Sequence, residues 1–192
     1  MLKLERVRRY AWADEAHDLA WTLAVVEGLD PAGVVAAYGG DPARSVGSIT
    51  FEQEQVPVGE FGKYHYLQVL ARERHVLAIE NNGWAGKSVE VAKGASRDRG
   101  RFFSVYWSLN ANYTLTQAID GRIVAHFDPL TVQHPAPPGE IYPAWITDVV
   151  FTDDSLHAVL LALLEEQTGL AFAREWLTAE LPAYRIPDDL TG

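Results

Sequence analysis

The segment Glu80-Asn81-Asn82-Gly83-Trp84 places a carboxylate, two amides and a tryptophan side by side. Because Asn-Gly favours a tight turn, the large ring of Trp84 must either dock on the protein or stay exposed. An exposed Trp84 beside the Asn amides could anchor a ligand, since Trp and polar loop residues supply contacts at recognition sites. A buried Trp84 would instead fix the loop onto the following helix, and residue statistics favour this second interpretation.

The segment His126-Phe127-Asp128 is the best acid–base candidate, because residues i and i+2 of a strand share one face. We favour a simpler interpretation, in which the imidazole lies on the open face of a sheet and the carboxylate caps the turn before Pro129. Asn110 more commonly builds a hairpin turn than a ligand site. A small-molecule site would draw on the following residues: Glu80, Asn82, Trp84, Asn110, His126 and Asp128.

Three arginines, Arg97, Arg99 and Arg101, could hold a phosphate or an acidic partner, although such a run is more often a solvated loop. His65 and His75 flank an expected hairpin and could meet a carboxylate such as Glu80, but no His-x-His or His-x₃-His spacing supports a metal. The sequence also lacks a phosphate loop, a nucleophile elbow, a His-Glu-x-x-His motif and a dinucleotide-binding glycine motif. We therefore expect no catalytic residue, no metal and no cofactor.

The composition and charge of the chain limit its expected partners and its expected location. The formal net charge is −10, which disfavours nucleic acid as a partner. Such acidity is more often a solvated surface, and attraction of a basic protein is the sharper alternative. From Ile123 onward, eleven acids face only Arg174 and Arg185. The chain has no Cys, no apolar run near the ~20 residues that span a bilayer and no apolar stretch typical of a secretion signal. We expect a cytoplasmic protein with no membrane contact.

Alternating β-prone residues and turn signals predict a set of strands. Asn81-Asn82-Gly83 and Asp120-Gly121 mark the clearest turns, the latter a type I′ hairpin dipeptide. The predicted strands are Leu19–Glu27, Val46–Glu54, Tyr64–Ala71, His75–Glu80, Phe102–Leu109, Tyr113–Ile119 and Arg122–Asp128.

Short helices follow Asp30-Pro31 and Ser88, which suit helix starts. A longer helix is expected from Ser155 to Gln167, with caps from Thr152 to Ser155 and an apolar stripe that ends at Gly169. A second C-terminal helix would carry Phe172, Trp176, Leu177 and Leu181 and close at Pro182. The sequence thus predicts a single α+β domain over residues 1–192: an antiparallel sheet of about six strands, short helices and a C-terminal helical pair packed on one face.

Four segments are distinctive in combination: Trp21–Pro31, Glu80–Trp84, Ser104–Ala111 and Gly121–Leu130. On these segments the chain resembles a bacterial, actinomycete-type family of unknown function with an Asn-Gly-Trp turn. It covers most of the chain up to about Leu130 and weakens beyond it. It implies a bacterial cytosolic origin and a single domain, and it brings no activity, cofactor or catalytic residue.

The leading expectation is a non-enzymatic interaction protein of the immunity or antitoxin kind, whose acidic surface meets a basic partner. The alternative is a small-molecule-binding or hydrolytic site between the sheet and the C-terminal helices. A weaker alternative is phosphate or nucleotide binding through the three arginines. The sequence does not set an oligomeric state.

Overall fold

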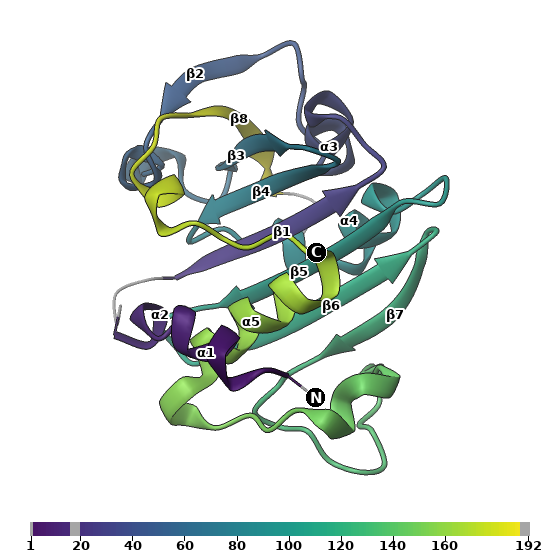
Figure 1. Cartoon of the computed structure of the whole chain (residues 1–192). Helices are drawn as coiled ribbons and strands as arrows, with labels where there is room; N and C mark the ends of the chain where they lie inside the picture. Colours follow the sequence, from purple (N-terminus) through teal and green to yellow (C-terminus); the bar gives the residue numbers. More distant parts are fainter. Residues whose placement is uncertain (1, 16–19, 189–192) are drawn as a thin grey trace.

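A computed structural model describes residues 2–15 and 20–188 and shows one sheet of eight antiparallel strands in the order β2-β8-β3-β4-β1-β5-β6-β7 (Figure 1). The strands are β1 Trp21–Glu27, β2 Ser45–Ile49, β3 Tyr64–Arg72, β4 His75–Asn81, β5 Arg101–Trp107, β6 Tyr113–Ile119, β7 Arg122–Phe127 and β8 Leu181–Pro187. The predicted antiparallel sheet with short helices is confirmed, but the sheet has eight strands and not about six. Leu19, the expected start of the first strand, lies outside the described residues.

The C-terminal helical pair is not observed. Its expected second helix is a short 3₁₀ turn, η6 Arg174–Leu177, followed by strand β8. Pro182, expected to end that helix, lies in β8 opposite Ser48 of β2 and beyond Ala183, the last residue of β8 paired with β3. Its missing N–H therefore interrupts no bond to β3, so the proline is accommodated near this end of the strand.

The expected strand Val46–Glu54 is only half a strand. After β2 the chain turns into a 3₁₀ helix, η1 Phe51–Gln53, whose start carries a capping box: the backbone N–H of Thr50 donates to Gln53 Oε1 at 2.9 Å. Phe51 is buried and meets the Trp21 ring edge-on at 6.0 Å. Local capping and the burial of Phe51 thus outweigh the β-propensity of this segment.

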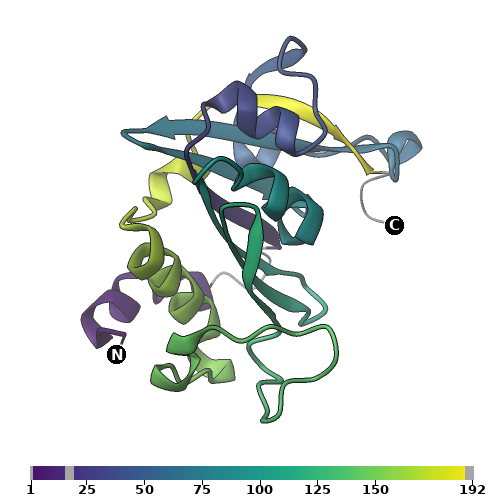
Figure 2. The same cartoon turned by 90° about the vertical axis from the view of Figure 1, so that its right-hand side faces the viewer.

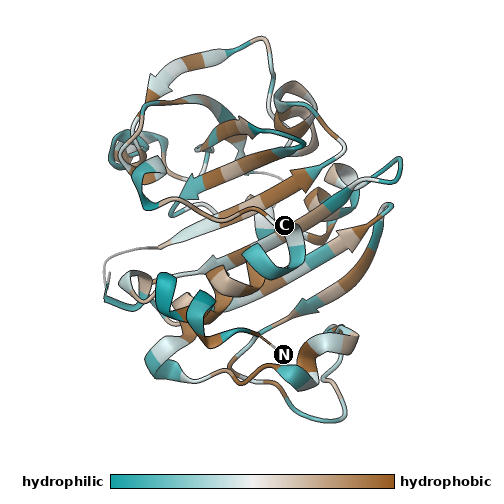
Figure 3. Cartoon of the chain, in the orientation of Figure 1, coloured by the Kyte–Doolittle hydropathy of each residue, from teal (hydrophilic) through white to brown (hydrophobic). Residues whose placement is uncertain are grey.

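Helices cover both faces of the sheet. Helices α1 Leu4–Arg9, α2 Trp12–Glu15 and α5 Leu156–Thr168 lie on one face, and α3 Pro31–Ala37 and α4 Val89–Ala95 lie on the other (Figure 2). The alternation of β1 explains this division, because Trp21, Leu23 and Val25 face the first set and Ala24 and Val26 the second. Figure 3 shows β1 hydrophobic along much of its length, and α1 mostly hydrophilic.

The predicted helix caps of the short helices are present. Asp30 Oδ1 accepts a hydrogen bond from Gly33 N at 2.8 Å, and Ser88 Oγ accepts one from Glu90 N at 3.2 Å. Further 3₁₀ turns are η2 Val58–Glu60, η3 Ala85–Lys87, η4 Ala144–Asp148 and η5 Asp153–Ser155.

Helix α5 is buried nearly all round and not along one stripe, and its start is capped from a distant part of the chain. Asp14 Oδ1 accepts hydrogen bonds from His157 N at 2.8 Å and Ala158 N at 3.3 Å. The expected local cap at Ser155 makes no side-chain hydrogen bond to the helix. A carboxylate at a helix start is favourable from any element, so α2 fulfils the role assigned to Thr152–Ser155.

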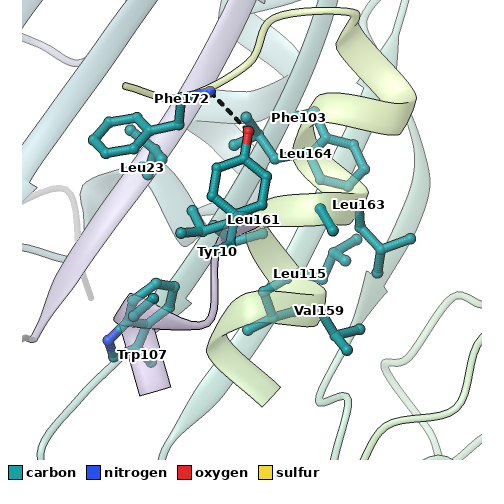
Figure 4. Packing of buried hydrophobic residues seen from close by; sticks show 14 of the residues in the cluster. Tyr10, Leu23, Phe103, Trp107, Leu115, Val159, Leu161, Leu163, Leu164 and Phe172 are labelled. Carbon is teal, nitrogen blue, oxygen red and sulfur yellow. Dashed lines mark hydrogen bonds between the residues drawn. The ribbon is translucent and has the colours of Figure 1, made fainter. Parts of the chain in front are cut away.

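Tyr10 ties the N-terminal helices to α5. Its hydroxyl donates to Glu165 Oε2 at 2.6 Å and accepts from Phe172 N at 3.0 Å, and its ring packs in the larger core (Figure 4). Arg9 Nη1 lies 2.8 Å from Glu165 Oε1. This network satisfies the buried carboxylate of α5, which would otherwise be costly.

Candidate functional site

A cleft of about 520 Å³ opens at one end of the sheet. There β1 and β3 begin, β4 and β8 end, and the segment 50–62 crosses the strand ends. In Figure 2 the end of β8 (yellow) lies beside the blue turns of this segment. The cleft is lined by Ala20, Glu54, Gln55, Val56, Val58, Phe61, Gly62, Tyr64, His65, Asn81, Asn82, Trp84, Leu109 and Asp188.

The mouth of the cleft exposes large apolar side chains. Val58 is 84% exposed, and Phe61 and Leu109 are each 65% exposed. Trp84 is half-buried and lies among them. Clustered apolar exposure marks binding surfaces in proteins, whereas scattered exposure does not.

Beneath the cleft the carboxylate of Glu80, at the end of β4, is fully buried. Its Oε2 accepts a hydrogen bond from Ala85 N and its Oε1 one from Gly86 N, both at 2.8 Å. The loop that follows β4 therefore folds back over the side chain of Glu80. Backbone N–H donors satisfy a buried carboxylate without a second ion.

Two glycines allow this close wrapping. A Cβ at Gly83 would lie 2.7 Å from Glu80 Oε2, and one at Gly86 would lie 2.9 Å from Glu80 Oε1. Asn82 adopts a φ of 52°, which Asn tolerates better than most residues. The Asn-Asn-Gly-Trp-Ala-Gly sequence thus has a structural reason: it seals a buried carboxylate and presents Trp84 to the cleft.

His65, near the start of β3, bridges two carboxylates. Its Nδ1 lies 2.8 Å from Asp188 Oδ1, and its Nε2 lies 3.0 Å from Glu80 Oε2, an ion-pair contact that is poorly aligned for a hydrogen bond. The ring stacks on Trp84 with centroids 6.2 Å apart. Burial lowers the pKa of His65, but the carboxylates of Glu80 and Asp188 outweigh it and leave the pKa above its ordinary value.

Glu54 brings a second buried carboxyl group to the cleft. It is 3% exposed, and its Oε2 accepts a hydrogen bond from Asn81 N at 2.7 Å. Its Oε1 has no hydrogen-bond partner among the described residues. Burial, with the nearby Glu80 charge, raises the pKa of Glu54 well above the usual range of a carboxyl.

Only some of the six residues predicted for a small-molecule site lie at this cleft. Asn82 and Trp84 line the cleft and Glu80 lies under it, but Asn110, His126 and Asp128 are not among the described residues that line it. Asn110 is exposed, and its backbone N–H donates to Ser108 Oγ. The six residues do not form one site.

His126 and Asp128 lie on and just beyond the edge strand β7. His126 Nδ1 is 3.0 Å from Thr116 Oγ1, and burial lowers the pKa of His126. Asp128 Oδ1 accepts from Leu130 N at 2.9 Å, which is the turn-capping role favoured above. Both side chains therefore have structural partners away from the cleft.

The three arginines lie at the opposite end of β5 from Leu109. All three are exposed around the turn that joins α4 to β5. The backbone N–H of Arg99 donates to Asp120 Oδ1 at 3.0 Å, which ties this turn to the β6–β7 hairpin.

The interval between the sheet and α5, where the alternative site was expected, is filled by core side chains.

Two residues of the cleft, Glu54 and Asp188, were not predicted from the sequence as site residues. Asp188 gave no local signal, because only the pairing of β8 with β3 brings it to His65. For His65 the sequence left open a contact with a carboxylate such as Glu80, and the structure shows that contact.

Within the described residues, no helix is long and apolar enough to cross a membrane. The same part of the chain places no group of three or more His, Cys, Asp or Glu side chains to hold a metal ion.

Fold and cleft together define an antiparallel α+β protein with an acidic, aromatic-rimmed cleft at the strand ends. The chain belongs to the family described as "Family of unknown function (DUF6461)", which matches residues 6–139. The matched region includes Glu54, His65, Glu80 and Trp84 and stops before Asp188. Comparisons with curated proteins and with solved structures find no match.

Proposed function

We propose that this protein binds a small organic molecule in the cleft at the strand ends. The single observation that carries the proposal is the combination of an open apolar mouth with buried polar groups at its base. Ligand sites in proteins are typically concave and mostly apolar, with a few polar groups that fix orientation, and they span roughly 300–1,000 Å³. A cleft of about 520 Å³ falls within that range.

The preformed wall supports the proposal. Trp84 is held by the loop that wraps Glu80 and by stacking on His65, so little ordering is required when a ligand arrives. This site lies at the strand ends and not between the sheet and the C-terminal helix. It retains the small-molecule hypothesis with a different set of residues.

A fragment screen tests the proposal with a matched pair of variants. Saturation-transfer NMR with neutral, cationic and anionic indole and phenyl fragments is run on the wild type, Leu109→Ser and Leu4→Ser. The two leucines are almost equally exposed, at 65% and 62%, but only Leu109 lines the cleft. We expect fragments whose signal falls in Leu109→Ser and persists in Leu4→Ser. No fragment binding, or equal loss in both variants, would overturn the proposal.

A second candidate function is the acidic interaction protein, of the immunity or antitoxin kind, expected from the net charge of −10. It is favoured by the segment 144–155, where Asp148, Asp153 and Asp154 are exposed around Val150, itself 78% exposed. An apolar side chain within an acidic surface suits a basic partner. Pull-downs at low salt with wild type and Val150→Asp test it, and equal recovery of all partners by both proteins would count against this surface.

The resemblance to actinomycete-type sequences supports a bacterial, cytoplasmic setting for either function. The Asn-Gly-Trp turn is part of that resemblance, and in this chain the turn builds the wall of the cleft.

A further inference from the structure

The charged groups around the cleft are mostly acidic. Glu54 and Asp188 line it and Glu80 lies directly behind, whereas His65, which bridges Glu80 and Asp188, is a cation when protonated. Neither Lys nor Arg occurs among the described residues that line the cleft. When all three carboxyl groups are ionised, a protonated His65 compensates one of the three negative charges, and two remain uncompensated.

Of these three carboxyl groups, Glu54 is the one with incomplete hydrogen bonding in the described part of the chain. One oxygen accepts the N–H of Asn81, while Oε1 has no partner among the described residues, although the side chain is 3% exposed. Buried polar atoms are nearly always paired, and an unpaired carboxylate oxygen costs free energy that a ligand donor would recover. When Glu54 is ionised, this oxygen is an unpaired acceptor that a donor group of a ligand would satisfy.

An aromatic face lies in the same cleft. Trp84 stacks on His65 and also lines the opening. Trp is the ring that attracts cations most strongly. The neighbouring Tyr64 already holds a cation in this way, with the Arg185 guanidinium 4.5 Å from its ring centroid.

We propose that the ligand is a small organic cation, with a protonated amine or amidine against Glu54 and an apolar body against Trp84 and the mouth of the cleft. This inference rests on the proposed function and names the class of ligand. An anionic ligand would meet uncompensated carboxylates, and a neutral ligand would leave the excess negative charge in place.

Proton exchange gives an independent signature. Because its pKa is raised, Glu54 without a bound ligand holds a proton over a wider pH range than an exposed carboxyl. A cation favours the ionised form, so binding releases a proton. Glu80 of β4 is the charged group that acts directly on Glu54. The other charged and titratable groups of the described cleft lining are Tyr64 and His65 of β3 and Asp188 after β8, with Glu60 and Arg185 at Tyr64.

Isothermal titration with three probes of similar shape tests the class of ligand. Tryptamine, tryptophol and indole-3-propionate carry a cation, a neutral hydroxyl and an anion on the same indole. We expect tryptamine to bind the wild type at least about tenfold more tightly than tryptophol, with indole-3-propionate weakest. Titration in buffers of different ionisation enthalpy should show proton release on tryptamine binding and none on tryptophol binding.

Two variants locate the effect. Glu54→Gln keeps an oxygen for Asn81 N and should weaken tryptamine at least about tenfold, while tryptophol changes less than about twofold. Glu52→Gln removes an exposed charge two residues away and should change neither Kd by more than about twofold. Equal effects of the two variants would show that only the general charge of the protein acts, which overturns the role of Glu54.

The outcomes separate this inference from the proposed function. If tryptamine and tryptophol bind equally well and both are lost in Leu109→Ser, the cleft binds ligands but does not select cations, and this inference fails alone. If none of the probes and no fragment binds, both fail. If Glu54→Gln does not fold, the selectivity and proton release of the wild type still decide the question.

Discussion

Replacing Glu80 by Gln tests the central claim about the loop after β4. Both carboxylate oxygens accept backbone N–H groups, from Ala85 and Gly86, at 2.8 Å in a fully buried position. A Gln amide offers one oxygen, so its NH₂ group must face one of these donors and leave it unpaired. An unpaired buried donor costs about 1–3 kcal/mol, and a hydrogen bond to a charged group contributes about 1.5–3 kcal/mol. The contact with His65 Nε2 at 3.0 Å weakens as well.

We therefore expect Glu80→Gln to lower the free energy of unfolding by about 2–4 kcal/mol in urea denaturation. Glu90→Gln, at an exposed position on α4, is the matched control and should stay within about 0.5 kcal/mol of the wild type. Amide hydrogen exchange at Ala85 and Gly86 gives a local readout and should accelerate in Glu80→Gln alone. A loss under about 1 kcal/mol with unchanged exchange at both amides would refute the wrapped-carboxylate argument.

Three further changes have defined outcomes in urea denaturation. Asp14→Ala removes the distant cap of α5 and should lower the free energy of unfolding by about 1 kcal/mol, whereas Asp153→Ala should lower it by less than about 0.5 kcal/mol. A larger loss in Asp153→Ala than in Asp14→Ala would show that the local segment caps the helix. Tyr10→Phe leaves Phe172 N–H without its acceptor and should cost about 1–3 kcal/mol, and a neutral result would contradict that bond. Because the pKa of His65 is raised on folding, its stabilisation is fully present below the unfolded value of about 6.5 and is lost as pH rises through the folded pKa. As pH rises above about 6.5, the unfolding free energy should thus fall more steeply in the wild type than in His65→Gln, and parallel curves would contradict the bridge.

The candidate site was only partly predictable. The turn residues around Trp84 stood out because Asn and Gly have strong local preferences, and the structure places them at the cleft. Asn110 and Asp128 have similar local chemistry, yet each serves its own turn. Residue type alone does not distinguish a turn that builds a site from one that only reverses the chain.

The sequence by itself determined most of the antiparallel sheet and the short helices, because alternation, hairpin dipeptides and caps such as Asp30 act over a few residues. Only the tertiary structure decided that Pro182 lies in a strand, that Asp14 caps α5 and that Asp188 reaches His65. Each of these depends on partners more than 100 residues away in the chain, and the free energy of such pairings comes from burial and hydrogen bonding across elements, which leaves no local pattern.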